Sequence, residues 1–166
     1  MFYVFAIINN ASRKIEHIAV TSCFNASWVV QQLREATPFG KQPKYLLHDN
    51  DPIFISKHFQ EGLTNMNIKS VRTAYRSPWQ NGISERLICT LRRELLDHII
   101  PLNEAHMRKH VQAYMVDYYN THRTHQGIDG QTPVTTKPPP PTLSRDIKLI
   151  SLPVLGGLYH TYEKAA

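Results

Sequence analysis

Two acidic residues stand out because of their spacing and the segments that flank them. Asp49 follows the apolar stretch 45–48, which is typical of a short buried strand, and open α/β sheets carry their chemistry at the carboxyl ends of strands. Glu85 follows after 35 intervening residues and opens a strongly periodic helix. Carboxylates brought together in this way would form a hard-oxygen site for Mg²⁺, which takes one or two protein carboxylates. The alternative is two solvated acids on unrelated surfaces.

The segments around these acids form an ordered set of motifs between about residues 2 and 134. They are LLHDND at 46–51, YRSPWQNG at 75–82, SERL at 84–87, LRRE at 91–94, YYN at 118–120, RTH at 123–125 and TP at 132–133. This set resembles the catalytic core of retroviral-type integrases and bacterial insertion-sequence transposases of the DDE superfamily. The ordered set is more specific than any single acid.

The resemblance implies a metal-dependent DNA site. In the superfamily two Asp and one Glu hold two divalent ions, Mg²⁺ or Mn²⁺, and Asp49 and Glu85 match the last two positions. These two residues are therefore the expected catalytic and metal-binding residues. Residues expected to contact DNA are Arg76, Trp79, Gln80, Asn81 and Arg92. The alternatives are that Arg92 is a solvated helix charge and that the loop only shapes a turn.

The first Asp of the triad has no counterpart in this sequence. The superfamily places it on a strand upstream of one that resembles residues 1–8, so we expect an N-terminally truncated core. Asn9 and Asn10 end that strand, and an amide cannot supply the missing charge. Loss of a bridging ligand predicts impaired two-metal chemistry. Without a central strand, the strands at 2–9 and 43–48 would each present an unpaired edge, which predicts marginal stability.

Composition agrees with this class. The 166 residues suit one domain, and 19 Lys and Arg against 13 Asp and Glu give a net charge of +6, which suits a phosphate-rich partner. Cys23 and Cys89 support neither a disulfide framework nor a cysteine zinc site. His106 and His110 have helical spacing without a third ligand, which argues against zinc. No stretch predicts a membrane span, and we expect a cytoplasmic protein.

Hydrophobic periodicity and capping residues predict the elements. Strands are expected at 2–9 and 14–22, joined as a hairpin by the polar turn 9–12, and at 43–48 and 68–73. Helices are expected to about residue 36 from a cap at Asn25 or Ser27, at 56–65, at about 83–98, and from Asn103 to 120. On the helix that Glu85 opens, the apolar arc contains Leu87, Ile88, Leu91 and Leu95. A hairpin is expected across Gly156 and Gly157, packed on the core, on a second subunit or on DNA.

These observations predict an α/β, ribonuclease H-like mixed sheet flanked by helices and lacking its first strand. The expected divisions are a core at 1–134, a Pro-rich linker at 135–142 and a C-terminal tail at 143–166. The expected function is DNA integration or transposition by strand transfer, with DNA and further copies of the chain as partners. The alternatives are a non-catalytic DNA-binding or oligomerising remnant and a ribonuclease H-like nuclease.

Overall fold

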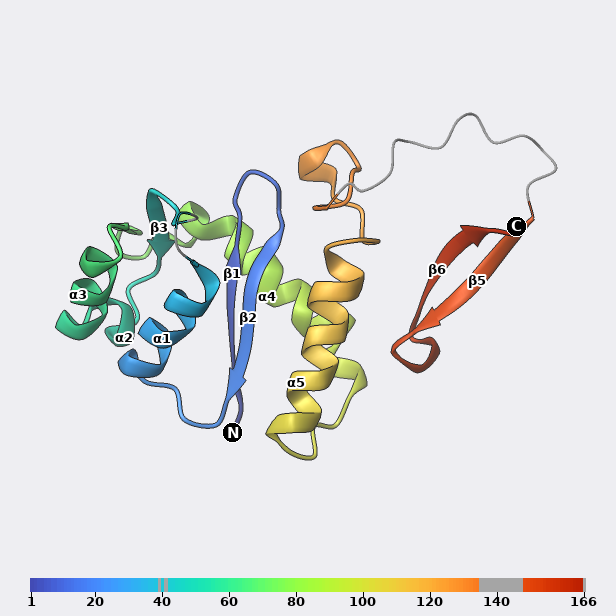
Figure 1. Cartoon of the computed structure of the whole chain (residues 1–166), viewed down its shortest axis with the longest axis horizontal. Helices are drawn as coiled ribbons and strands as arrows, with labels where there is room; N and C mark the ends of the chain where they lie inside the picture. Colours follow the sequence, from blue (N-terminus) through green and yellow to red (C-terminus); the bar gives the residue numbers. More distant parts are fainter. Residues whose placement is uncertain (39, 41, 135–147, 166) are drawn as a thin grey trace.

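The computed structural model of the chain describes residues 1–38, 40, 42–134 and 148–165 (Figure 1). The expected Pro-rich linker at 135–142 and the first residues of the expected tail lie outside this part. Among the described helices, none has the length and apolar character needed to cross a bilayer.

The chain begins with the predicted hairpin. β1 (Tyr3–Ile8) pairs antiparallel with β2 (Ile15–Thr21), with Phe5 opposite Ala19. The side chain of Asn9 closes the turn because its Oδ1 accepts hydrogen bonds from the backbone N–H groups of Ala11 (3.0 Å) and Ser12 (3.1 Å). This local bonding of an Asn side chain explains why the polar segment 9–12 forms a turn.

β1 lies between two apolar clusters, which explains its uninterrupted apolar sequence. Val4, Ala6 and Ile8 pack against a cluster formed mainly by later helices. Phe5 and Ile7 point to the other face and pack against a second cluster. Because successive side chains of a strand alternate between faces, a strand covered on both sides needs apolar residues at every position.

The second cluster is built by the elements that follow the hairpin. They are α1 (Ala26–Ala36), β3 (Tyr45–His48), α2 (Pro52–Ile55) and α3 (Lys57–Asn65), together with Ile68 just before β4 (Lys69–Arg72), whose own residues are exposed. Asn25 caps α1, since its Oδ1 accepts from the N–H of Trp28 at 3.0 Å. Gly62 on α3 allows close packing on α1, because a Cβ there would lie only 2.8 Å from a methyl carbon of Val30. The sequence pattern did not predict the short helix α2.

The first cluster is built by the second half of the chain. Its helical elements are α4 (Gly82–Glu94), the 3₁₀ turn η2 (Leu96–His98), α5 (Glu104–Gln112) and the π-helical segment η3 (Ala113–Tyr119). The helix predicted at 83–98 ends earlier in the structure. Leu95, with φ −131° and ψ −59°, does not have a helical backbone conformation. In Figure 1, α4 passes behind β1 and β2, and α5 lies on the opposite side of the hairpin from α1.

Three two-stranded ladders make up the described strands. β1 pairs with β2, β3 pairs in parallel with β4, and β5 (Leu149–Val154) pairs antiparallel with β6 (Tyr159–Lys164). Within the described residues β1 and β3 are not hydrogen-bonded to each other. The mixed parallel and antiparallel character expected from the sequence is present, but in separate ladders. Gly156 and Gly157, both with positive φ, turn the chain between β5 and β6.

The C-terminal hairpin packs on the core, which answers one question that the sequence left open. The Tyr159 ring lies 4.7 Å from that of Tyr118 and 5.7 Å from that of Tyr114, measured between centroids. The Tyr159 hydroxyl donates a hydrogen bond to the backbone oxygen of Glu94 at 2.5 Å. A two-stranded hairpin is marginal in isolation, so these contacts supply part of its stability.

Candidate active site

Asp49 stands at the carboxyl end of β3, as the sequence predicted, and its side chain is exposed. The preceding residue, His48, is buried and holds this position. The Nδ1 of His48 donates to the backbone oxygen of Asp49 (2.7 Å), and the His48 Nε2 lies 2.8 Å from the hydroxyl of Ser70. Because a carbonyl only accepts, the ring carries its proton on Nδ1, and Nε2 accepts from Ser70. Sequence reasoning did not single out His48.

The ends of β3 and β4 are tied together beside Asp49. The N–H of Thr73 donates to the oxygen of His48 at 3.0 Å, and the Asn50 amide donates to the oxygen of Thr73 at 3.0 Å. Thr73 is buried, with 6% of its surface exposed. Because β3 and β4 run parallel, these two hydrogen bonds hold their carboxyl ends side by side, and the loop at 74–81 begins there.

The loop at 74–81 presents large side chains to solvent. Tyr75 is 77% exposed and Trp79 is 75% exposed. Arg76 has a φ of 53°, and its guanidinium carbon lies 5.2 Å from the centre of the Tyr75 ring. The residues from Pro78 to Asn81 form a 3₁₀ turn that leads into α4. Exposed aromatic rings beside a cation are suited to bases and phosphates.

Gln80 differs from the other loop residues expected to contact DNA. Its side-chain oxygen accepts a hydrogen bond from the backbone N–H of Ala74 at 2.7 Å. This bond closes the loop across six positions. Sequence reasoning placed Gln80 among the DNA contacts, whereas here its side-chain oxygen is used to shape the loop that carries Trp79 and Arg76.

Glu85 lies in the first turn of α4, and its side chain is exposed. A carboxylate at this end of a helix is stabilised by the helix dipole. Arg92, two turns later, is also exposed. The prediction that Ile88 points into the core is wrong, because 61% of its surface is exposed. Thr90, with 7% exposed, takes part in the buried face in its place.

Asp49 and Glu85 offer the hard oxygen ligands that a divalent cation prefers, and both are exposed to solvent. The part of the chain that the structure describes contains no group of three or more His, Cys, Asp or Glu arranged to hold an ion. Asp51, the nearest further acid in sequence, uses its Oδ1 to cap α2 through the N–H of Ile53 at 2.8 Å. The donor chemistry of the two carboxylates fits a divalent cation.

Another acid of the motif set, Glu94, lies in a different environment. Arg123 binds its carboxylate through two bonds, Nε to Oε2 at 2.9 Å and Nη2 to Oε1 at 2.6 Å, and the Tyr114 hydroxyl donates to Oε2. Burial raises the pKa of Glu94, but the hydrogen bonds from Arg123 and Tyr114 outweigh it, and the net pKa lies below its ordinary value. Burial and the neighbouring Glu94 raise the pKa of Tyr114 far above its usual range.

Asn120, the last residue of the YYN motif, is also buried. Its Oδ1 accepts from the N–H of Ile15 at 2.8 Å, and its Nδ2 donates to the oxygen of Ile15 at 3.0 Å. The side chain thus pairs with β2 as a neighbouring strand would. Its backbone oxygen accepts from the N–H of Val134 at 2.8 Å, next to the TP motif. Sequence spacing gave no sign of this contact across 105 positions.

Comparison with known sequences matches a segment that contains the motifs between residues 75 and 133. Residues 66–133 match the model of the integrase core domain family. The transposase for insertion sequence element IS904 of Lactococcus lactis subsp. lactis (strain IL1403) is 30% identical over 99 residues, which cover 55% of this chain and 37% of that protein. The chain thus spans little more than a third of that relative. The resemblance to integrase and transposase cores that the sequence indicated is confirmed.

Solved structures give the same fold at low identity. One chain of the cryo-EM structure of the simian T-cell lymphotropic virus intasome in complex with PP2A regulatory subunit B56 gamma is 17% identical, with a TM-score of 0.60 over 99% of this chain and 62% of that chain. The HTLV-2 integrase catalytic core domain in complex with magnesium, in its dimeric form, is 19% identical, with a TM-score of 0.55 over 80% of this chain and 81% of that chain. The ribonuclease H-like α/β fold is confirmed.

Proposed function

We propose that this chain, which carries an integrase-type core of the DDE superfamily, acts in DNA integration or transposition. Asp49 and Glu85 form the reactive centre in this proposal. The observation that supports this most directly is the surroundings of the two acids. Both carboxylates are exposed, one at the end of β3 and one at the start of α4, and the loop with Tyr75, Arg76 and Trp79 runs to α4 from β4, the strand that pairs with β3. Strand transfer, the attack of a DNA 3′-hydroxyl on a phosphodiester, is the specific reaction proposed.

In this proposal Asp49 and Glu85 would hold Mg²⁺ or Mn²⁺, which supplies Lewis-acid stabilisation of charge on the phosphate. His48 fixes the backbone beside Asp49, and Glu85 lies in the first turn of α4, at the positive end of the helix dipole. Arg92 and Arg76 neutralise phosphates of the bound duplex, while Trp79 and Tyr75 contact its bases or sugars. Asn81 and the amide of Gln80 complete the DNA-facing loop.

A second candidate function is DNA binding without catalysis. It is favoured because, among the described residues, no three His, Cys, Asp or Glu side chains are grouped so that they could hold an ion. Two-metal phosphoryl chemistry needs carboxylates to hold both ions against their mutual repulsion, so an incomplete set lowers activity. A chain of this kind would occupy DNA or join other copies of itself. HTLV-2 integrase cores solved in dimeric and trimeric forms make self-association a reasonable expectation here as well.

Nicking of a supercoiled plasmid in Mg²⁺ or Mn²⁺ distinguishes the two candidates. Catalysis predicts nicking that Asp49→Asn and Glu85→Gln each reduce by at least tenfold, while Asp97→Asn, an exposed acid on η2, leaves it unchanged. Nicking that persists in Asp49→Asn would reject the proposed centre. Absence of nicking in the unaltered chain, with duplex binding retained, would favour the second candidate.

Duplex binding itself is tested through its salt dependence. If Arg92 contacts a phosphate, Arg92→Ala weakens binding to a random-sequence duplex and lowers the slope of log K against log salt by about one unit. Arg34→Ala, an exposed cation on α1, is the matched control and should leave the slope unchanged. Equal salt-dependence slopes for the unaltered chain, Arg92→Ala and Arg34→Ala would show that Arg92 is a solvated helix charge and does not contact a phosphate.

A further inference from the structure

The first two turns of α5 bring two imidazole rings together. His106 and His110 are separated by one helical turn, and their Nε2 atoms lie 2.9 Å apart, with ring centroids at 4.5 Å and planes at 87°. The backbone N–H of Leu102 lies 3.3 Å from the Nδ1 of His106. Because an N–H only donates, Nδ1 of His106 accepts, and the proton of this ring stands on Nε2. That proton points to His110, whose Nε2 therefore presents a lone pair.

The distance between the two Nε2 atoms also fits the separation of two nitrogen ligands that bind the same ion. Two histidine nitrogens bound at about 2.0–2.1 Å and at right angles lie about 2.9 Å apart, whereas tetrahedral ligands lie about 3.4 Å apart. The observed 2.9 Å matches the right-angled arrangement of octahedral and square-planar sites. Imidazole nitrogens suit Cu²⁺, Ni²⁺ and Zn²⁺, while Mg²⁺ prefers oxygen.

We propose that His106 and His110 form a two-histidine site for a divalent transition metal with right-angled ligands, Cu²⁺ or Ni²⁺, with water in the remaining positions. The ion takes the place of the proton between the two rings. That proton moves from Nε2 to Nδ1 of His106, so none is lost. The bond from the Leu102 N–H to Nδ1 is given up, and water replaces it because that contact is exposed.

The proposed site differs from a zinc site, against which the sequence argues. A tetrahedral structural zinc site needs three or four protein ligands, and no group of three His, Cys, Asp or Glu occurs among the described residues. The proposed site uses two ligands and a different geometry. Its imidazole ligands also set it apart from the carboxylate centre proposed above, so it does not depend on that function.

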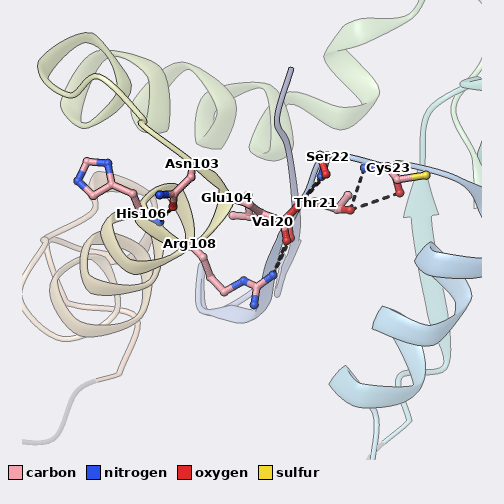
Figure 2. Close-up of polar contacts among 8 residues, drawn as sticks. All are labelled: Val20, Thr21, Ser22, Cys23, Asn103, Glu104, His106 and Arg108. Atoms are coloured by element: carbon pink, nitrogen blue, oxygen red, sulfur yellow. Dashed lines mark hydrogen bonds and ion pairs between the residues drawn. The ribbon is translucent and has the colours of Figure 1, made fainter.

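A metal ion bound by His106 and His110 would stabilise the contact between α5 and β2 (Figure 2). The Oδ1 of Asn103 caps α5 through the N–H of His106 at 2.8 Å. In the same turn, Oε2 of Glu104 accepts from the N–H and the hydroxyl of Ser22, each at 3.0 Å. Arg108 bonds to Glu104 at 2.7 Å. An ion that links positions 106 and 110 fixes this turn and so stabilises its contact with the end of β2.

Titration calorimetry and Cu²⁺ electron paramagnetic resonance of the full chain test the proposal. We expect one Cu²⁺ or Ni²⁺ per chain, an equatorial signal from two nitrogens, and a rise in Tm when the metal is added. His106→Gln and His110→Gln should each weaken binding by at least tenfold. His58→Gln, which removes an exposed histidine on α3, should leave binding unchanged.

Binding that survives the double replacement of His106 and His110, or no binding by the folded unaltered chain, would overturn the proposal. Should either single variant fail to fold, nuclear magnetic resonance of the unaltered chain provides a second measurement. Ni²⁺ should then broaden the ring signals of His106 and His110 before those of the other histidines. Uniform broadening of all histidines would equally count against the site.

Discussion

Glu85 and Glu94 lie on the same helix, α4, but in opposite environments. Glu85 is exposed in the first turn, at the positive end of the helix dipole. Glu94, in the last turn, is half-buried and receives hydrogen bonds from Arg123 and Tyr114, while its backbone oxygen receives one from Tyr159. One end of the helix therefore offers a charge to a partner, and the other end has its charge neutralised within the fold.

This difference separates the motif set into two groups. Asp49, Glu85 and Arg92 are exposed, which is what a metal or a phosphate requires. Glu94 bonds to Arg123, to Tyr114 of η3 and to Tyr159 of the C-terminal hairpin, and Asn120 bonds to Ile15 of β2. Residues of the motif set therefore have two different roles. The exposed residues form one group, and the residues that are shielded from solvent and hydrogen-bonded within the fold form the other.

The largest expected effect on stability is at the Glu94 end. Arg123→Ala leaves a half-buried carboxylate without its bidentate partner, and we expect a loss of about 2–3 kcal/mol in the free energy of unfolding, below the range for fully buried pairs because both side chains are about a quarter exposed. Urea denaturation measures it. Arg93→Ala, on the exposed surface of α4, should change stability by less than about 0.5 kcal/mol. Equal losses in the two variants would contradict the grouping.

Asn120 should follow with a smaller effect. Asn120→Ala removes both bonds to the backbone of Ile15 and leaves that edge of β2 unpaired, which we expect to cost about 2 kcal/mol. Hydrogen exchange adds a local measurement, since the Ile15 amide should lose protection more than the Ala19 amide, which lies farther along β2. Unchanged protection at Ile15 would show that water or a neighbour replaces the side chain.

The third effect is a pH dependence. Since the pKa of Glu94 is lowered in the folded chain, its contribution to stability is present above the ordinary value of 4.5 and is lost as the pH falls through the folded-state pKa. We therefore expect acid to weaken the contact with Arg123 and the hairpin. Glu94→Gln should flatten the decline in unfolding free energy between about pH 5 and pH 3. A decline of the same slope in Glu94→Gln would assign the acid sensitivity to other groups.

The smallest effect is expected at the proposed reactive centre. Asp49→Asn and Glu85→Gln alter exposed side chains, so each should change the free energy of unfolding by less than about 0.5 kcal/mol. Thermal denaturation without divalent metal measures this. A loss above about 1 kcal/mol in either variant would place that acid with Glu94 in the structural group, and the comparison between the ends of α4 would fail.

Local patterns in the sequence determined most of the elements. The apolar run of β1, the turn at Asn9 and the helix caps Asn25 and Asn103 were all predictable, because periodicity and capping act between residues close in sequence. The position of Asp49 at a strand end and of Glu85 at a helix start followed from the same signals. So did the hairpin at Gly156 and Gly157, where positive φ favours glycine.

Only the tertiary structure decided which of these residues are bound within the fold and which face solvent. Glu94 meets Arg123 across 29 positions and Asn120 meets Ile15 across 105, and no local pattern specifies such pairs. Ile88 has an apolar side chain at a helical position beside Leu87, yet it is exposed. The buried face of α4 is chosen by the shape of the surface it packs on, here β2, α5 and η3, and that surface exists only once the chain has folded.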